Sequence, residues 1–268
     1  MIATHVSRTA ELMAHRPRSL KHEYELYVER EIEDYKESVP RHVLLSIGDE
    51  AVASITNQTQ LSLTELLLCD EVDRIIRARL RLPSYTTWRR RRLKALKELS
   101  RPERWGLLPD GMLAKTVESA KEGHVLVAGA VEEGPALYLA ANGCEVTALD
   151  STEDMLERVI HAATAVGLTG LVHGKIADLG SYAPEVPLKA VVCTTGALAS
   201  LSRPERERAI SLLQEATTDG GVHMLETSAD DEGLVTREEL EASYQGWQIF
   251  VEPGFNCAET FLARKSVA

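Results

Sequence analysis

Apolar residues in the first hundred positions recur at helical spacing. In SLKHEYELYVEREIEDYKE, which begins at Ser19, they recur about every three to four positions, as one face of a helix requires. These residues are Leu20, Tyr24, Tyr27, Val28, Ile32 and Tyr35. Pro40 then predicts the end of the segment. The pattern therefore indicates a helix that buries one side.

Three more helices are expected before position 105. VPRHVLLSIGDEAVASI is typical of a short apolar helix, with an interruption at Gly48. The next helix begins at Ser62 or Thr64, both suitable caps, and stops before Pro83. The fourth covers TTWRRRRLKALKEL. Residues 1–105 are therefore predicted to form an all-helical N-terminal module, with short polar connections of the length found in small bundles.

After a linker around ERWGLLPDG, the pattern changes to alternating strands and helices. Short apolar, β-branched runs are typical of buried parallel strands. They predict strands at 124–129, 144–149, 171–176, 189–194 and 220–227, and two late strands at 247–251 and 258–263. Helices are expected at 134–141, 152–166 and 204–216. Repeated strand–helix units imply a mostly parallel sheet. The last two strands have no helix between them, so we expect a seven-stranded sheet that ends in an antiparallel hairpin.

Charge divides the chain more sharply than composition does. The 44% hydrophobic and 26% charged residues are those of an ordinary globular protein, and no apolar run is long enough to span a bilayer. The N-terminal segment has no apolar signal-peptide core, so the expectation is a cytoplasmic protein without membrane contact. Residues 1–105 carry a net charge of about +3 and residues 106–268 about −14. Because the acidic half repels phosphates, we expect no nucleic-acid partner.

Neither cysteine nor histidine spacing indicates a metal site. The four cysteines lie far apart, and the eight histidines form no metal-binding pattern, so no metal is expected. The arginine run at 89–92 is either a solvated face that docks on an acidic surface or an anion site suited to guanidinium forks. The N-terminal module is either a cap over the carboxyl ends of the strands or a homodimerisation module.

The segment VLVAGAVEEGPALYLAANGCEVTALD resembles the first cofactor motif of class I S-adenosylmethionine-dependent methyltransferases. ALYLAANGCEVTALD and the ending LEASYQGWQIFVEP…AETFLARK resemble in particular the tellurite-resistance methyltransferase group. The resemblance covers residues 106–268 and does not reach the N-terminal helices. It implies a Rossmann-like α/β domain, S-adenosylmethionine as the cofactor and a small molecule as the methyl acceptor.

The resemblance also implies site residues at the strand ends. Gly129 lies in the turn that approaches the cofactor. Asp150, with Ser151 beside it, corresponds to the acid that binds the ribose hydroxyls; otherwise it caps the following helix. Asp178 corresponds to the acid that meets the adenine amino group; otherwise it is an exposed turn carboxylate. Thr194 lies where the methionine portion meets the substrate; otherwise it is a plain strand terminus.

The first motif departs from the family pattern, acidic–x–Gly–x–Gly–x–Gly. Positions 127–133 read VAGAVEE, so one glycine is in register and the acid is missing, while Gly134 comes one place late. Val131 cannot cheaply adopt a positive φ, so the loop must take another course. Ala130 and Glu133 are expected to line the cofactor. Glu132 or Glu133 either replaces the lost acid at the methionine ammonium group or repels the cofactor.

A nicotinamide dinucleotide fits the same loop less well. Gly129 and Gly134 match the first and third glycines of G-x-G-x-x-G, but Val131 occupies the middle position. The terminal hairpin also argues against this class of protein.

Two functions follow. The first is methyl transfer by in-line displacement, in which proximity and orientation supply most of the rate. Glu226 and His223 in the fifth strand are the candidate general bases, with a structural role as the alternative. The second is a cofactor-binding or regulatory module, or an enzyme of other chemistry, that kept the fold and lost ordinary methyl transfer.

Overall fold

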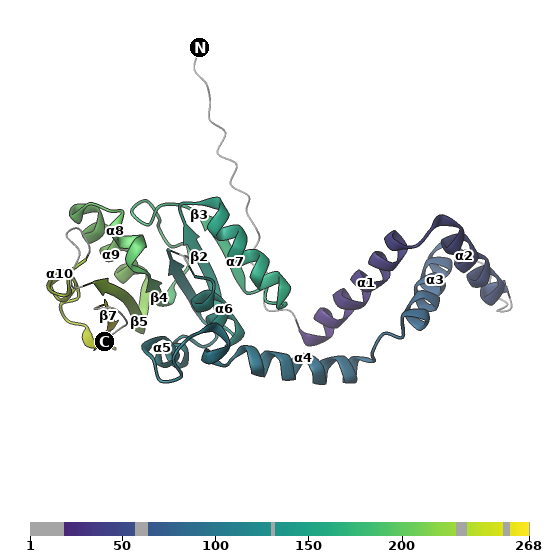
Figure 1. Ribbon diagram of the computed structural model, residues 1–268, viewed down its shortest axis with the longest axis horizontal. Coiled ribbons are helices and arrows are strands. Elements are labelled where there is room, and N and C mark those ends of the chain that lie inside the picture. The colour runs from purple at the N-terminus through teal and green to yellow at the C-terminus, as the bar shows by residue number, and fades with distance from the viewer. Residues whose placement is uncertain (1–18, 57–63, 130–131, 229–234, 254–257, 268) are drawn as a thin grey trace, which may run out of the picture. The chain divides into compact units, whose positions relative to one another are not determined.

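The computed structural model (Figure 1) describes residues 19–56, 64–129, 132–228, 235–253 and 258–267. The contacts between residues divide this part of the chain into two compact units, one that ends at Ala95 and one that begins at Leu96. The boundary falls inside α4 (Tyr85–Leu99), ahead of the position 106 at which we predict the α/β domain to begin. No helix in the described ranges is long and apolar enough to cross a membrane.

The N-terminal unit consists of helices, as predicted. They are α1 (Leu20–Ser38), α2 (Arg41–Thr56), α3 (Thr64–Leu80) and most of α4. Ser19 caps α1 by accepting a hydrogen bond from the backbone N–H of His22 at 3.2 Å. The core of the N-terminal unit combines one face of α1 with residues of α2 and α3. The buried residues are Tyr24, Val28, Ile32, Ile47, Ala51, Ile75 and Ile76.

The interruption predicted at Gly48 is wrong. Helix α2 continues through this glycine from Arg41 to Thr56. A glycine inside a helix costs about 1 kcal/mol relative to alanine. Ile47 and Ala51 on either side of it are fully buried, and this burial offsets the cost.

The second unit contains one sheet and its flanking helices. The strands are β1 (His124–Ala128), β2 (Glu145–Asp150), β3 (Val172–Ile176), β4 (Leu188–Cys193), β5 (Thr217–Ser228), β6 (Gln248–Pro253) and β7 (Ala258–Arg264). The helices are the short 3-10 turn η1 (Pro102–Trp105), α5 (Met112–Ala120), α6 (Gly134–Ala141), α7 (Glu153–Ala165), α8 (Thr195–Ala199), α9 (Arg203–Ala216) and α10 (Arg237–Ser243).

The strand order is β3-β2-β1-β4-β5-β7-β6. Strands β1 to β5 pair in parallel, whereas β7 is antiparallel to both β5 and β6. This confirms the predicted seven-stranded, mostly parallel sheet with a terminal antiparallel hairpin, preceded by a helical module. The hairpin strand β7 lies between β5 and β6, so the last strand in sequence is not at the edge.

Alternate residues of each strand face different cores. Val125 and Val127 of β1 pack with α5, α6 and α7 on one face of the sheet. Leu126 and Ala128 pack with α8, α9 and α10 on the other face. The parallel strands are therefore buried on both sides, which explains their continuous apolar runs.

Among the described residues of this unit, three α-helices (α5, α8 and α10) and the 3-10 turn η1 were not predicted. Helix α8 has five residues and α10 has seven, too few to show a helical period. The β3–β4 connection, residues 177–187, contains no helix at all. Gly180, Pro184 and Pro187 interrupt it, and Leu179 and Tyr182 cover the sheet face there instead.

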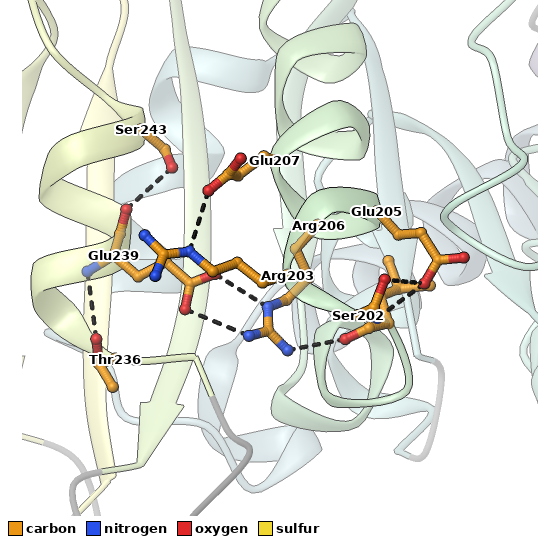
Figure 2. Close-up of polar contacts among 9 residues, drawn as sticks. Ser202, Arg203, Glu205, Arg206, Glu207, Thr236, Glu239 and Ser243 are labelled. Carbon is orange, nitrogen blue, oxygen red and sulfur yellow. Dashed lines mark hydrogen bonds and ion pairs between the residues drawn. The ribbon is translucent and has the colours of Figure 1, made fainter.

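A buried ion pair joins α9 to α10 (Figure 2). The Arg206 guanidinium contacts both carboxylate oxygens of Glu239, at 3.1 and 3.3 Å. Its third nitrogen donates to the carbonyl of Leu201 at 2.8 Å. Only 10% of the Arg206 side chain and 12% of the Glu239 side chain are exposed. The pair therefore holds α10 against α9 in a site that excludes most water.

His223 on β5 belongs to a second buried network. Its side chain is fully buried, and its two ring nitrogens lie 2.6 Å from the Tyr244 hydroxyl and 2.7 Å from that of Thr217. Thr217 donates to the carbonyl of Leu213, so Nε2 of His223 carries the proton and Nδ1 accepts from Tyr244. Burial, and then the charge of Lys265, lower the pKa of His223 to about 3. The structural alternative for His223 is therefore the one that the fold supports.

This network predicts a pH dependence of stability. In the unfolded chain the pKa of His223 returns to about 6.5, so below that pH the unfolded state binds the extra proton. The stabilisation is complete above pH 6.5 and is lost as the pH falls toward 3. Between pH 7.5 and 5.5 the free energy of unfolding should fall by about 1.4 kcal/mol more in the native protein than in His223→Gln. Urea titrations at both pH values measure this difference, and equal losses in the two proteins would contradict the assignment.

Candidate functional site

The predicted site residues meet at one edge of the sheet. Ala128 pairs with Leu149 of β2 on one side and with Cys193 of β4 on the other. The next residues in each strand, Gly129, Asp150 and Thr194, therefore lie side by side at the carboxyl ends of three neighbouring strands. Asp178 follows β3, whose last residue pairs with Asp150. Open α/β sheets bind ligands at this edge.

Gly129 and Thr194 fit each other closely. Gly129 has φ of +72°, and its N–H donates to the carbonyl of Leu149 at 3.0 Å. A Cβ at this position would lie 2.3 Å from the Thr194 hydroxyl and 2.9 Å from Cβ of Ala197. The hydroxyl donates to the Gly129 carbonyl at 2.9 Å. Thr194 is thus more than a strand terminus, because it fixes the turn after β1.

Asp150 uses one carboxylate oxygen locally. Its Oδ1 accepts hydrogen bonds from the backbone N–H of Thr152 at 2.9 Å and from the Thr152 hydroxyl at 2.6 Å. These bonds form a local turn ahead of α7, whose N-cap is Thr152; that helix has no side-chain capping hydrogen bond. No described residue donates to Oδ2. The ribose role therefore remains a prediction for the second oxygen, with the exposed Ser151 next to it.

Asp178 has a similar arrangement. Its Oδ1 accepts from the backbone N–H of Gly180 at 2.7 Å, and its side chain is exposed. The local turn orients the carboxylate while the other oxygen receives no hydrogen bond from a described residue. Its adenine role stays a prediction.

The loop after β1 contains the largest departure from the family pattern. Ala130 and Val131 lie outside the described residues. Glu133 precedes α6 and forms an ion pair with Arg158 of α7 at 3.0 Å, while Glu132 is exposed. Of the two carboxylates predicted to meet the ammonium group, Glu133 is therefore already paired with a cation. Sequence reasoning missed Arg158, because no spacing rule connects residues 25 positions apart.

Gly134, which lies one position later than the family pattern places its glycine, is required by packing. A Cβ here would lie 2.9 Å from the carbonyl oxygen of Trp105. The turn η1 thus packs directly on the start of α6, where only glycine leaves room. A contact between segments so distant in sequence gives no local sequence signal.

Glu226 lies at the same edge, one strand beyond Thr194. Its predecessor Leu225 pairs with Cys193, the residue before Thr194. Burial, and then the negative charge of Glu226, raise the pKa of the Cys193 thiol to about 12. Cys193 is therefore a neutral core residue, whereas Glu226 is partly exposed. Among the described residues, no three potential metal ligands are arranged to hold an ion.

Together these groups offer acceptors for hydroxyl and amino donors beside a close backbone turn. Carboxylates from two neighbouring strands suit a polar ligand that carries several donors. The glycine turn allows the ligand to approach the main chain. No side chain in this arrangement is an activated nucleophile.

The comparisons with known proteins concern mainly the fold. No family model and no curated protein sequence matches the chain. The structure is similar to that of TehB from Haemophilus influenzae, with a TM-score of 0.50 and 18% identity over 57% of this chain. The match spans 61% of that protein.

Two other solved structures illustrate the range of similar proteins. The N-methyltransferase NodS from Bradyrhizobium japonicum WM9 has a TM-score of 0.48 and 12% identity over 60% of this chain and 100% of its own. Magnesium protoporphyrin IX methyltransferase (ChlM) from Synechocystis PCC 6803 has a TM-score of 0.48 and 19% identity, and the match covers 59% of this chain and 77% of that protein. The strand order and the likeness to TehB confirm the Rossmann-like, methyltransferase-type fold of the second unit.

Proposed function

We propose that this protein transfers a methyl group from S-adenosylmethionine to a small-molecule acceptor in the cytoplasm. One observation carries the proposal: Gly129, Asp150, Asp178 and Thr194 lie at the carboxyl ends of four neighbouring strands, at one edge of a methyltransferase-type sheet. The motif resemblance to the tellurite-resistance group is part of the same proposal.

The residues present fit this cofactor. Oδ2 of Asp150 is open to the ribose hydroxyls, and Asp178 to the adenine amino group. The Gly129 turn, fixed by Thr194, lets the methionine portion approach the main chain. The cofactor supplies an electrophilic methyl group on a sulfonium. The protein holds the two reactants in line and excludes water, which is the main source of rate in such a displacement.

The test is calorimetric titration of the full-length protein with S-adenosylmethionine and S-adenosylhomocysteine. Binding of both would support the proposal. The absence of heat for either ligand at millimolar concentration would overturn it. Light scattering of the same sample tests whether the N-terminal helices form a homodimer, the alternative to a cap.

The second candidate is a module that kept the fold and lost ordinary methyl transfer. The ion pair between Glu133 and Arg158 favours it, because it neutralises a carboxylate that could replace the missing acid at Val127. In the form of this hypothesis in which the loop after β1 excludes the cofactor, the native protein binds no S-adenosylmethionine. The triple change Val127→Asp, Val131→Gly and Glu133→Gly, which restores the family pattern, would then create binding.

We expect the double variant Glu132→Gln, Glu133→Gln to bind S-adenosylmethionine more weakly than the native protein. The two carboxylates provide the negative charge nearest to the expected ammonium group, and the loss should be greatest at low salt, where screening is weakest. Calorimetry at 20 and 200 mM salt measures the effect. The control is Glu118→Gln, Glu215→Gln, which removes two exposed charges elsewhere in the unit. If the native protein and the double variant bind S-adenosylmethionine equally well, groups other than these two carboxylates bind its ammonium group.

A further inference from the structure

We propose that two copies of this protein associate through the outer edge of β6, so that their two sheets join into one. The inference concerns assembly and does not depend on the proposed methyl transfer. Strand β6 is the last in the sheet order and pairs with β7 alone, so no described strand lies along its other side. The partner is β6 of a second copy, paired antiparallel.

The hydrogen bonds of β7 show which main-chain groups of β6 are used within the sheet. Lys265, which follows β7, directs both its N–H and its carbonyl to residues 220–221 of β5. These directions alternate along an antiparallel strand, so Leu262, three residues earlier, directs its groups to β6. Leu262 pairs with Phe250. The main chain of Phe250 is therefore occupied by β7.

The two neighbours of Phe250 direct their main-chain groups the other way. By the same alternation, the N–H and the carbonyl of Ile249 and Val251 point away from β7. No described residue takes up these hydrogen bonds. The outer side of β6 therefore offers two donors and two acceptors in the spacing that another strand requires.

The side chains of β6 do not block this edge. Natural edge strands are commonly protected by lysines, by bulges or by being very short. Strand β6 has six residues, carries neither lysine nor arginine, and pairs with β7 without a bulge. Its one charged side chain, Glu252, forms an ion pair with Lys115 of α5. Phe250 adds a large apolar side chain that is 52% exposed. The edge thus has the features of a pairing surface.

One register satisfies the main chain and the side chains together. A two-fold axis through Phe250 places Ile249 opposite Val251 of the second copy, and this pair exchanges both main-chain hydrogen bonds. The two Phe250 rings then lie opposite each other in the close, non-hydrogen-bonded position, where aromatic pairs stabilise a sheet. Gln248 lies opposite Glu252 of the second copy, so an amide, and not a second carboxylate, meets the negative charge.

The neighbouring registers are worse for identifiable reasons. An axis through Val251 would place Ile249 opposite Pro253, which has no N–H to donate. It would also set Phe250 against the carboxylate of Glu252. An axis through Ile249 would separate the two Phe250 rings. An axis between two residues would oppose groups that point outward to groups that point toward β7. The axis through Phe250 is therefore the one that we expect.

Charge gives this association a distinctive salt dependence. Each copy carries a net charge of −11, so two copies repel each other, and salt screens the repulsion. The expected register contains no ion pair between the copies that salt would weaken. The β6 dimer should therefore become stronger as the salt concentration rises. A dimer in which the basic helix α4 of one copy docks on the acidic unit of the other would become weaker.

Sedimentation equilibrium of the full-length protein at 50 and 500 mM salt tests the interface. The native mass should rise with protein concentration from that of one chain toward that of two, and more so at 500 mM. Phe250→Asp sets two carboxylates opposite each other and should weaken the dimer at least about tenfold. Val251→Pro should also weaken it, because it removes an outward N–H at a position where an edge strand tolerates proline.

The matched control lies at the other edge of the sheet. Ile176 is the last residue of β3, and 58% of its side chain is exposed. Ile176→Asp adds the same charge as Phe250→Asp and should leave the dimer unchanged. Thermal unfolding of each variant verifies that the chain is folded.

Cross-linking tests the register directly, in a background that carries Cys69→Ser and Cys257→Ser. Phe250→Cys should give a disulfide-linked dimer on mild oxidation, because the close pair brings the two Cβ atoms within reach of each other. Gln248→Cys, at the same edge, should give far less, since it lies opposite Glu252. A monomer at every concentration, a dimer that survives Phe250→Asp, or equal cross-linking at the two positions would overturn this inference and leave the proposed methyl transfer untouched.

Discussion

Replacing Glu239 with methionine is expected to lower the free energy of unfolding by about 3–5 kcal/mol, because the change leaves the Arg206 guanidinium charged and buried without its partner. Methionine keeps the length and the helix propensity of the side chain, so lost packing contributes little. Urea unfolding at 25 °C and pH 7.5 measures the loss from the transition midpoint and its slope.

The matched control lies on the same helix. Glu241 pairs with Arg237 at 2.7 Å, but about half of each side chain is exposed. Glu241→Met should therefore cost no more than about 0.5 kcal/mol. The double change Arg206→Met, Glu239→Met should recover most of the loss, since it removes both charges. If Glu239→Met cost as little as Glu241→Met, the Arg206–Glu239 pair would have no special role in holding α10.

Asp150→Ala should weaken the binding of S-adenosylhomocysteine by at least tenfold. It removes two hydrogen bonds from ribose hydroxyls to a carboxylate, each worth about 1.5–3 kcal/mol. It also removes the local hydrogen bonds from Thr152, which should lower the free energy of unfolding by about 1 kcal/mol. Calorimetry measures the first effect and urea unfolding the second.

Asp150→Asn separates the two roles of this residue. The amide oxygen can still accept from the N–H of Thr152, so stability should be nearly native. The charge that strengthens the ribose bonds is lost, so affinity should still fall. Native affinity in a folded Asp150→Ala protein would leave the local turn with Thr152 as the whole role of the side chain.

The sheet could be predicted from sequence almost residue by residue, and the reason is physical. Buried parallel strands require continuous apolar, β-branched runs, so β1, β2 and β4 lie within one or two residues of the predicted limits. The absence of a predicted helix between β6 and β7 correctly gave the antiparallel hairpin. Helices of five or seven residues, such as α8 and α10, have no comparable period and were missed.

Of the candidate site, the sequence allowed us to predict only which residues lie at strand ends. Gly129, Asp150 and Thr194 follow strands, and strand ends are visible in the sequence. What the side chains contact was not predictable, because the partners come from elsewhere in the chain. Arg158 neutralises Glu133 from another helix, and the carbonyl of Trp105 explains why position 134 is glycine. The buried partners of His223, the hydroxyls of Thr217 and Tyr244, likewise left no signal in the sequence.

The place of β7 in the sheet has a consequence for the order of events during synthesis. Among the described strands, β6 pairs with β7 alone, and β7 separates it from β5. Until residues 258–264 have left the ribosome and folded onto the sheet, the outer side of β5 is uncovered and β6 has no strand to pair with. An uncovered strand edge is a template for pairing with other chains. The outer edge of β5 is therefore open to pairing with other chains until β7 has joined it.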